Sequence, residues 1–240
     1  MSWLSEKDNL SKNRRRRGSE SISFEVLDME LFTERLCLRP FQETDVYAIL
    51  EKKYNTEGKL MIETKRLLLR EYTPDDFDAL YEILSDPETM RHYPAPYDEA
   101  GTRHWIEWNL ENYTEYGFGL WAVVLKETGE FIGDCGITIQ NINGEMLPEI
   151  GYHIHKKYWH RGFAKEAARA VRNWAFQNTD YPALYSYCKY TNVPSFRTAE
   201  SIGMHFVCEY PGETNGTTHV SAISREEWLN EIAKRSNEQE

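Results

Sequence analysis

The segment EIGYHIHKKYWHRGFAKEAARAV, residues 149–171, contains residue types that could bind a phosphate group. Its alternation predicts a strand that ends near His155, and its alanine run predicts a helix that begins near Gly162. The first amides of a helix lack backbone acceptors and lie at the positive end of its dipole, so they attract anions. Gly162 adds no side chain there, while Arg161 and Lys165 add positive charge. We expect a phosphate site at this turn; a glycine that only turns a strand into a helix is the alternative.

A second helix opening follows in NVPSFRTAESIGM, residues 192–204. Asn192 stands at the cap position and Gly203 at the end, directly after a strand predicted near residues 184–189. Ligands of open α/β sheets bind in crevices at strand ends. We therefore expect the two helix openings to face the same crevice.

Three polar side chains share one face of the strand that precedes the first opening. Residues two apart point to the same side of a strand, so Glu149, His153 and His155 lie together with Gly151. The two histidines could be metal ligands, but the sequence offers no convincing third ligand. We expect no metal, and we predict that both histidines pack or contact a cofactor.

The elements that must position these residues begin near residue 61. Thr73, Pro74 and Asp76 predict a helix start after a strand over residues 62–72, and residues 127–130 predict a hairpin turn. The predicted order β α α β β β α β α β β indicates an α/β (α+β) fold with a mixed, mostly antiparallel central sheet and helices on both faces. Neither GxGxxG nor GxxxxGK[ST] occurs, which argues against dinucleotide-binding and P-loop folds.

Composition excludes several classes of protein. The 240 residues are 40% hydrophobic and 13% aromatic, which excludes a chain that is mainly disordered. No apolar run approaches the roughly 18 to 20 residues of a membrane span, and no secretory signal is visible. Four cysteines without CxxC spacing indicate reduced thiols in a cytoplasmic protein. A formal charge of −11 argues against a general nucleic-acid-binding surface.

The N-terminal part differs from the rest in charge and in pattern. Residues 1–20 carry six Lys and Arg against three acidic residues, so the acidity belongs to the remainder. The run Arg14–Arg17 is typical of a solvated tail, with phosphate contact or an address signal as alternatives. Residues 33–50 resemble residues 64–81 at a constant offset of 31, which indicates a partial repeat of a strand and helix. This copy could pack on a sheet edge, pair two chains into a homodimer, or stay unpaired.

Four segments together resemble the GNAT superfamily of acyl-CoA-dependent N-acyltransferases, and within it the branch similar to ribosomal-protein N-terminal acetyltransferases. The segments are TKRLLLREYTPDDFDAL, FIGDCGI, EIGYHIHKKYWHRGFAKEA and NVPSFRTAESIGM, and the resemblance covers about residues 62–227. It implies a GNAT-like sheet with splayed central strands. Together with the basic N-terminal run and the repeat described above, it predicts three parts of the chain: a basic tail without fixed structure (1–30), the partial repeat (31–60) and an N-acetyltransferase domain (61–235).

The resemblance further implies that acetyl-CoA binds as a cosubstrate, without a metal. The pantetheine arm would pair with the backbone of His153, Ile154 and His155. The pyrophosphate would lie on the amides of Arg161, Gly162, Phe163, Ala164 and Lys165. Asn192 and Ser195 would line the far side.

Transfer of an acetyl group to an amine requires the amine to be neutral, so we expect a base. By resemblance, Glu149 occupies a strand position that carries a carboxylate base in some superfamily members, with an ordinary strand-end carboxylate as the alternative. Tyr93 and Tyr97 would line the acceptor mouth. Ala199 stands where many relatives place a tyrosine that protonates the departing thiolate, so Ser195, a water or another tyrosine would take that role.

The expected function is transfer of an acetyl group from acetyl-CoA to a primary amine, either a protein N-terminal α-amino group or the amine of a small molecule. The alternative is a non-catalytic module on the same fold that binds acyl-CoA or a protein partner. The missing tyrosine at Ala199 motivates this alternative.

Overall fold

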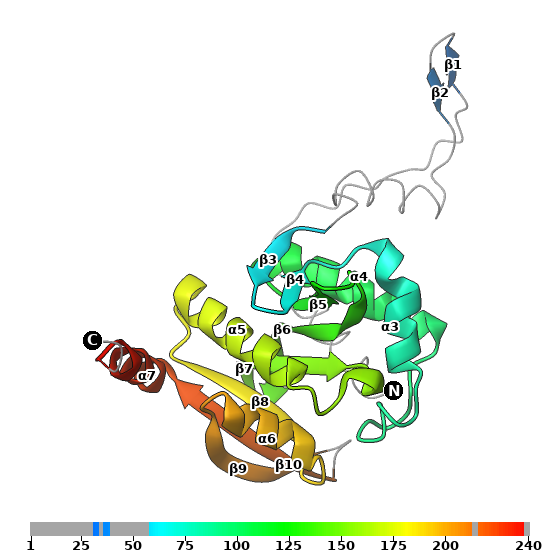
Figure 1. Cartoon of the computed structure of the whole chain (residues 1–240). Helices are drawn as coiled ribbons and strands as arrows, with labels where there is room; N and C mark the ends of the chain where they lie inside the picture. The colour runs from blue at the N-terminus through cyan, green and yellow to red at the C-terminus, as the bar shows by residue number, and fades with distance from the viewer. Residues whose placement is uncertain (1–30, 34–35, 39–57, 213–215, 238–240) are drawn as a thin grey trace, which may run out of the picture. The chain divides into compact units, whose positions relative to one another are not determined.

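The computed structural model describes residues 31–33, 36–38, 58–212 and 216–237 (Figure 1). The chain divides into two compact units, residues 1–50 and 51–240. The run Arg14–Arg17 and the tail expected over residues 1–30 lie outside the described residues.

The described part of the first unit is a hairpin of two antiparallel strands, β1 (Leu31–Thr33) and β2 (Leu36–Leu38). Its register pairs Leu31 with Leu38. The helix expected after this hairpin falls on residues 39–57, which are outside the described residues.

The second unit is built on an eight-stranded sheet with the order β3-β4-β5-β6-β7-β8-β10-β9. Neighbouring strands pair antiparallel except β7 and β8, which are parallel. This arrangement confirms the expected mixed, mostly antiparallel sheet. The strands are β3 (Leu60–Glu63), β4 (Leu67–Arg70), β5 (Leu120–Leu125), β6 (Phe131–Ile142), β7 (Glu145–Ile154), β8 (Ala183–Lys189), β9 (His205–Gly212) and β10 (Gly216–Ser224).

The partial repeat in the sequence is also a repeat of a hairpin. The β3–β4 hairpin pairs Ile62 with Leu69, and these residues lie 31 positions after Leu31 and Leu38, which pair in the first unit. The repeated segment therefore has the strand register of the first hairpin of the larger unit.

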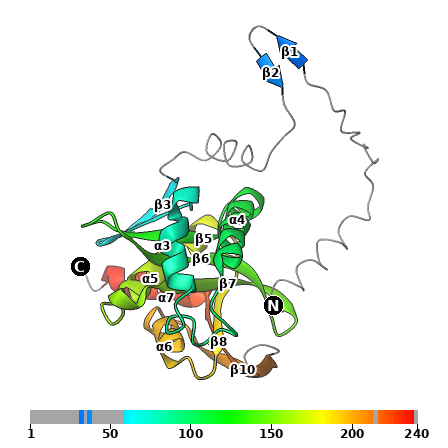
Figure 2. The same cartoon turned by 90° about the vertical axis from the view of Figure 1, so that its right-hand side faces the viewer.

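Helices cover both faces of the sheet (Figures 1 and 2). They are η1 (Pro74–Asp76), α3 (Phe77–Leu84), α4 (Glu99–Tyr116), η2 (Lys156–Tyr158), α5 (Phe163–Asn178), α6 (Val193–Ser201) and α7 (Arg225–Asn237). On β7, the His153 ring packs against Trp105 of α4, whereas the Tyr152 hydroxyl reaches Ser195 of α6. Successive side chains of a strand point to opposite faces, so α4 and α6 lie on opposite sides of the sheet. None of the helices among the described residues is long and apolar enough to cross a membrane.

The single strand expected over residues 62–72 is two strands joined by a turn. At the turn, the Leu67 amide donates to the Thr64 hydroxyl at 2.9 Å, and the Thr64 amide donates to the Leu67 carbonyl at 2.9 Å. The Thr64 hydroxyl also donates to Glu166 of α5 at 2.7 Å. The prediction of one strand was wrong because a contact with a residue 102 positions away holds the turn.

A hydrophobic core on the sheet supports the strands that carry the site. Leu69, Trp121, Ile137 and Ile150, from β4 to β7, are each fully buried. Trp121 packs edge to face on Trp174 of α5, with ring centroids 4.9 Å apart. Burial of a large apolar side chain stabilises a fold by about 1.5–3 kcal/mol. These strands therefore form a rigid base.

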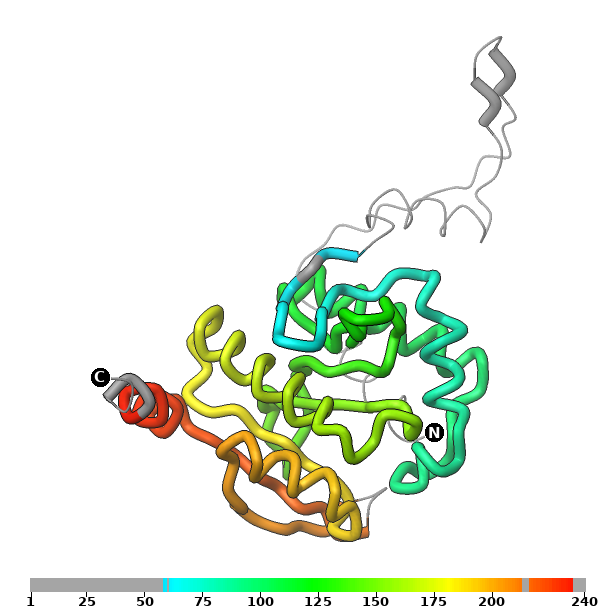
Figure 3. Tube along the Cα trace, in the orientation of Figure 1, coloured from blue at the N-terminus to red at the C-terminus, as the bar shows by residue number. Residues whose placement is uncertain are grey.

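The two parallel strands separate soon after they meet. Among the described residues, β7 and β8 pair at one position, Glu149 with Tyr185. Residues 150–154 of β7 and 186–189 of β8 then continue without pairing to each other, which confirms the expected splayed central strands. We call these two segments the wedge. Figure 3 follows the chain from the end of β7 into α5, and from β8 into α6.

Candidate active site

The loop that follows β7 presents free backbone amides. Gly162 (φ 78°) and His160 (φ 59°) adopt left-handed conformations that turn the chain into α5. The first backbone bond at the start of α5 runs from the Glu166 amide to the Gly162 carbonyl at 3.1 Å. The amides of residues 163–165 therefore have no acceptor within the helix. Together with the helix dipole, these amides form a cradle for an anion.

An arginine that sequence reasoning missed stands beside this cradle. A guanidinium nitrogen of Arg66 lies 3.7 Å from the position that a Cβ on Gly162 would take. Arg66 also donates to the Arg161 carbonyl at 3.0 Å and pairs with Glu166 at 2.6 Å. Its side chain is 40% exposed, so its charge is open to an anion on the cradle. Arg66 lies 95 positions before Arg161, and no spacing in the sequence connects the two.

The other residues predicted at the pyrophosphate lie in different environments. Arg161 and Lys165 are exposed, and Ala164 is half-buried. Phe163 is buried, with its ring 4.3 Å from the Arg66 guanidinium and 5.5 Å from that of Arg161. Only the backbone of Phe163 is therefore available to a ligand; the use of its amide by a pyrophosphate stays a prediction.

The end of β7 is fixed by side chains from two directions. The Ile154 carbonyl accepts a hydrogen bond from the Trp159 indole at 2.6 Å, and the Ile154 side chain is buried. The His155 ring lies 3.3 Å from the Glu82 carboxylate of α3. His155 thus faces α3, on the same side of the sheet as His153, as the strand alternation predicted.

The second helix opening is formed as expected, and it brings an additional tyrosine to the wedge. The Asn192 side chain caps α6 by accepting from the Ser195 amide at 3.4 Å. The Tyr152 hydroxyl donates to the Ser195 carbonyl at 2.7 Å and lies 3.3 Å from the Ser195 hydroxyl. Burial raises the pKa of Tyr152, so its hydroxyl keeps its proton at neutral pH. Tyr152 was missed because it lies on the face of β7 opposite to Glu149.

Ala199 is 1% exposed and belongs to the hydrophobic core beneath α6. No hydroxyl can reach the wedge from that position. The Tyr152 and Ser195 hydroxyls lie next to each other at the start of the same helix. They are therefore candidates for the role that the missing tyrosine would have.

Glu149 is a buried carboxylate on the α4 side of the sheet. Glu149 is 9% exposed, and its carboxylate accepts a hydrogen bond from the Thr138 hydroxyl at 3.2 Å. A Cβ on Gly151 would lie 3.1 Å from a Glu149 carboxylate oxygen, so the carboxylate extends over Gly151. Burial raises the pKa of Glu149 to about 7, against the opposing effect of the Thr138 hydrogen bond. A group with this pKa can act as a base near neutral pH.

His153 makes specific side-chain contacts on the same face. Its Nδ1 lies 2.7 Å from the carboxylate of Asp134 on β6, which is fully buried. Its Nε2 lies 2.5 Å from the Tyr93 hydroxyl. The sequence predicted a backbone contact of His153 with the cofactor and a side chain that packs or contacts the cofactor; it did not predict the partners of the ring. Asp134 was not singled out, although it stands in FIGDCGI, one of the segments that carry the resemblance.

The two tyrosines predicted to line the mouth for the acetyl acceptor lie near His153. Tyr93 is 39% exposed, and Tyr97 packs edge to face on Trp105 with ring centroids 5.6 Å apart. Trp105 is buried, and its ring packs edge to face on the His153 ring with centroids 5.4 Å apart. Tyr93, Tyr97 and Glu149 thus lie on the α4 side of the sheet, whereas Ser195 and Asn192 lie on the α6 side.

The described residues contain no group of three or more His, Cys, Asp or Glu that could hold a metal ion. The side chains near the wedge are instead arranged for an anionic ligand with an extended arm. The free amides before Glu166, the Arg66 charge and the separated strands of the wedge fit the pyrophosphate and pantetheine of an acyl-CoA, although the His153 amide and the Ile154 carbonyl already bond to the side chains of Asp134 and Trp159.

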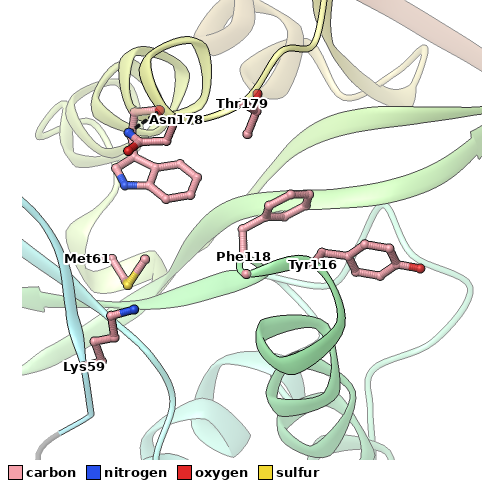
Figure 4. Close-up of a pocket in the computed structure, with 8 residues that line it drawn as sticks. Lys59, Met61, Tyr116, Phe118, Asn178 and Thr179 are labelled. Atoms are coloured by element: carbon pink, nitrogen blue, oxygen red, sulfur yellow. Dashed lines mark hydrogen bonds between the residues drawn. The ribbon is translucent and has the colours of Figure 1, made fainter.

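A separate pocket of about 470 Å³ lies between β3, the end of α4 and the end of α5 (Figure 4). In Figure 4, Lys59 and Met61 line it on the left, Phe118 and Tyr116 on the right, and Asn178 and Thr179 at the top. Its α5 residues are at the C-terminal end of a 16-residue helix, about 24 Å from the cradle. This pocket shares no residue with the wedge.

Comparison with known proteins agrees with this arrangement. The profile of the "Acetyltransferase (GNAT) domain" family matches residues 66–205. The protein YkkB of Bacillus subtilis is 38% identical over 62% of this chain and 87% of its own length. The N-acetyltransferase YnaD of the same organism is 30% identical over 70% of this chain and 98% of its own.

A solved structure shows the same fold at lower identity. RimL, described as a ribosomal L7/L12 α-N-protein acetyltransferase in complex with coenzyme A, is 16% identical to this chain. The match has a TM-score of 0.58 and covers 69% of this chain and 98% of RimL. The family profile spans more than half of the 240 residues, and the two Bacillus proteins align over most of their length. This chain therefore belongs to the GNAT family of acetyltransferases.

Proposed function

We propose that this chain transfers an acetyl group from acetyl-CoA to a primary amine, either a protein N-terminal α-amino group or the amine of a small molecule. The observation that carries the proposal is the wedge, which opens between β7 and β8 and is flanked by the starts of α5 and α6. Acetyl-CoA would supply the acetyl thioester, with its pyrophosphate on the amides of residues 163–165 and beside Arg66.

Glu149 is the proposed base. An ammonium group must lose a proton before its nitrogen can attack, and unperturbed pKa values are about 10.4 for a lysine amine and about 7.7 to 8.0 for an α-amino group. A carboxylate with a pKa of about 7 takes this proton far more readily from an α-amino group. The site therefore favours an N-terminus, or a small amine of similar basicity, over an ordinary lysine.

Ser195 is the proposed source of the proton for the departing thiolate, with Tyr152 as its partner. The two hydroxyls lie 3.3 Å apart at the start of α6, on the far side of the wedge from Glu149. Separating the acid from the base by the strand prevents their direct neutralisation. The ribosomal-protein branch adds one specific acceptor to the proposal, the α-amino group of a ribosomal protein, which the name of RimL suggests.

Acetyl-CoA binding to Gly162→Glu tests the cradle. The new carboxylate would stand beside the phosphates, so we expect the affinity measured by calorimetry to fall at least tenfold. Gly129→Glu is the matched control: Gly129 (φ 72°) also has a left-handed conformation and open space around its Cα, but it lies in the β5–β6 turn. Equal acetyl-CoA affinities of the two variants would show that the phosphates do not bind at the start of α5.

Thiol release separates catalysis from binding alone. We expect wild-type protein to release CoA thiol from acetyl-CoA in a panel of amines and N-terminal peptides, with a matching acetyl mass shift on at least one acceptor. The non-catalytic alternative rests on the buried Ala199. Tight acetyl-CoA binding without release over the whole panel would favour that alternative.

A further inference from the structure

Asp134 determines which nitrogen of His153 carries hydrogen. One Asp134 oxygen accepts from the Tyr72 hydroxyl at 2.8 Å and the Trp105 indole at 3.0 Å. The other accepts from the His153 backbone amide at 3.1 Å and faces the His153 Nδ1 at 2.7 Å. A carboxylate only accepts, so Nδ1 must be the donor in this contact. In a neutral His153 the Nε2 atom is then the acceptor.

The Nε2 atom faces the hydroxyl of Tyr93. Tyr93 places its hydroxyl 2.5 Å from Nε2, and Tyr93 is 39% exposed at the proposed acceptor mouth. Since Nε2 accepts, the Tyr93 hydroxyl donates to it, and a hydroxyl oxygen that donates can still accept a hydrogen bond. The three residues thus form a continuous chain of hydrogen bonds from a fully buried carboxylate to the hydroxyl of a partly exposed tyrosine.

We propose that Tyr93, His153 and Asp134 form a proton relay that takes a proton from the attacking amine. Tyr93 is the catalytic residue, because its hydroxyl would touch the amine. His153 and Asp134 are positioning residues that act through it. The inference rests on the proposed acetyl transfer and adds a second base to it.

A second base is needed because a primary ammonium loses two protons when it becomes an amide. Glu149 takes the first proton and leaves a neutral amine. As the new C–N bond forms, the Tyr93 oxygen accepts the second proton from nitrogen and passes its own proton to His153 Nε2. The C–S bond breaks with its electron pair on sulfur, which receives a proton from Ser195. Ser195 is reprotonated from solvent, and His153 and Glu149 return their two protons to solvent.

The charges around His153 favour this role. Burial lowers the pKa of His153, but the Asp134 charge and hydrogen bond, together with the Glu149 charge, outweigh it, so the pKa lies above 6.5. Asp134 faces His153 from β6, Glu149 lies on the same strand, and Tyr93 approaches from the loop before α4. The ring of Trp105 covers the remaining side from α4. An imidazolium formed during transfer is therefore stabilised.

The pH dependence of kcat in Tyr93→Phe tests the relay. In wild-type protein both Glu149 and His153 must be deprotonated, so log kcat should fall with a slope of about two at pH values below the pKa of both groups. Tyr93→Phe disconnects His153. We expect a slope of about one, a kcat lower by about 10- to 100-fold, and an unchanged KM for acetyl-CoA. His153→Gln should show the same change of slope.

Tyr116→Phe is the matched control, since Tyr116 is 43% exposed and lies at the far end of α4. Tyr116→Phe should keep the wild-type kcat and the wild-type slope of log kcat against pH. A Tyr93→Phe variant with wild-type kcat and slope would overturn the relay, while turnover by the wild-type protein would uphold the proposed function. Absence of turnover in the wild-type protein over the whole acceptor panel would overturn both.

The tautomer of His153 gives a readout that needs no turnover. In protein labelled with ¹⁵N-histidine, we expect the neutral His153 ring to carry its hydrogen on Nδ1, both in wild-type protein and in Tyr93→Phe. An Nε2–H tautomer in wild-type protein would overturn the relay, because Nε2 could not then accept from Tyr93.

Discussion

At the scale of single residues, burial makes Glu149 useful as a base and unfavourable for stability at the same pH. Its pKa rises from 4.5 in an unfolded chain to about 7 in the fold. A raised pKa contributes stability below pH 4.5 that is lost as the pH rises through 7. At pH 8 the ionised carboxylate therefore destabilises the fold by about 3 kcal/mol relative to a neutral group.

Glu149→Gln should consequently be more stable and less active than the wild-type protein. At pH 8 we expect a higher free energy of unfolding, measured with denaturant, and a rate of acetyl transfer lower by at least about 100-fold. Near pH 4 the difference in stability should vanish. Glu145→Gln, at an exposed position of the same strand, should change neither quantity. Equal stability of Glu149→Gln and wild-type protein at pH 8 would contradict the burial argument.

The alternation of β7 was sufficient to predict that Glu149 and His153 share a face. It could not predict the partners of the His153 ring, because Asp134 and Tyr93 lie 19 and 60 positions away. The position of Arg66 beside the cradle could not be predicted for the same reason, since Arg66 lies 95 positions before Arg161. Side chains that meet only through tertiary packing leave no periodic pattern in the sequence.

At the scale of elements, one carboxylate ties the start of α5 to the first hairpin of the large unit. Glu166 accepts from the Thr64 hydroxyl at 2.7 Å, from the Arg66 amide at 2.9 Å and from the Arg66 Nε at 2.6 Å. Burial raises the pKa of Glu166, but these hydrogen bonds and the Arg66 charge outweigh it and lower the pKa overall. A lowered pKa gives stability that is present above pH 4.5 and lost as the pH falls through the folded value.

Glu166→Gln should lower the free energy of unfolding at pH 7 by about 2 kcal/mol, because three hydrogen bonds lose their charged acceptor. It should also weaken acetyl-CoA binding, since α5 and Arg66 would lose their fixed placement at the cradle. The two proteins should converge in stability at low pH. Glu99→Gln, which removes an exposed pair with Arg103 at 3.6 Å, should cost less than about 0.5 kcal/mol. A Glu166→Gln variant as stable as Glu99→Gln would refute the tie.

Elements with strong local patterns were predictable. Helix α4 has local signals at both ends, since the Asp98 side chain caps its start and Gly117 (φ 77°) stands at its end. The hairpin around residues 127–130 was also confirmed. The break between β3 and β4 was missed because Glu166 holds it. The splay of β7 from β8 came from the family resemblance, since sequence periodicity contains no angle between strands.

At the scale of the whole molecule, the proposed site lies within one of the two units. Every residue of the wedge, the cradle and the relay falls between residues 58 and 237, and the unit from residue 51 onward has a hydrophobic core of its own. The division into a tail (1–30), a partial repeat (31–60) and a catalytic domain (61–235) remains a proposal. Pairing of two copies through the repeat also remains a proposal.

Deletion of residues 1–57 should therefore leave acetyl-CoA affinity and acetyl transfer within about twofold of the full chain, because no described side chain of the site is removed. Calorimetry and the thiol-release assay measure the two quantities on the same preparations. The mass in solution tests the pairing separately: if the repeat joins two chains, the full chain should be a dimer and the deletion variant a monomer. An unchanged mass would remove the pairing proposal. A loss of affinity of tenfold or more would show that residues 1–57 contribute to acetyl-CoA binding.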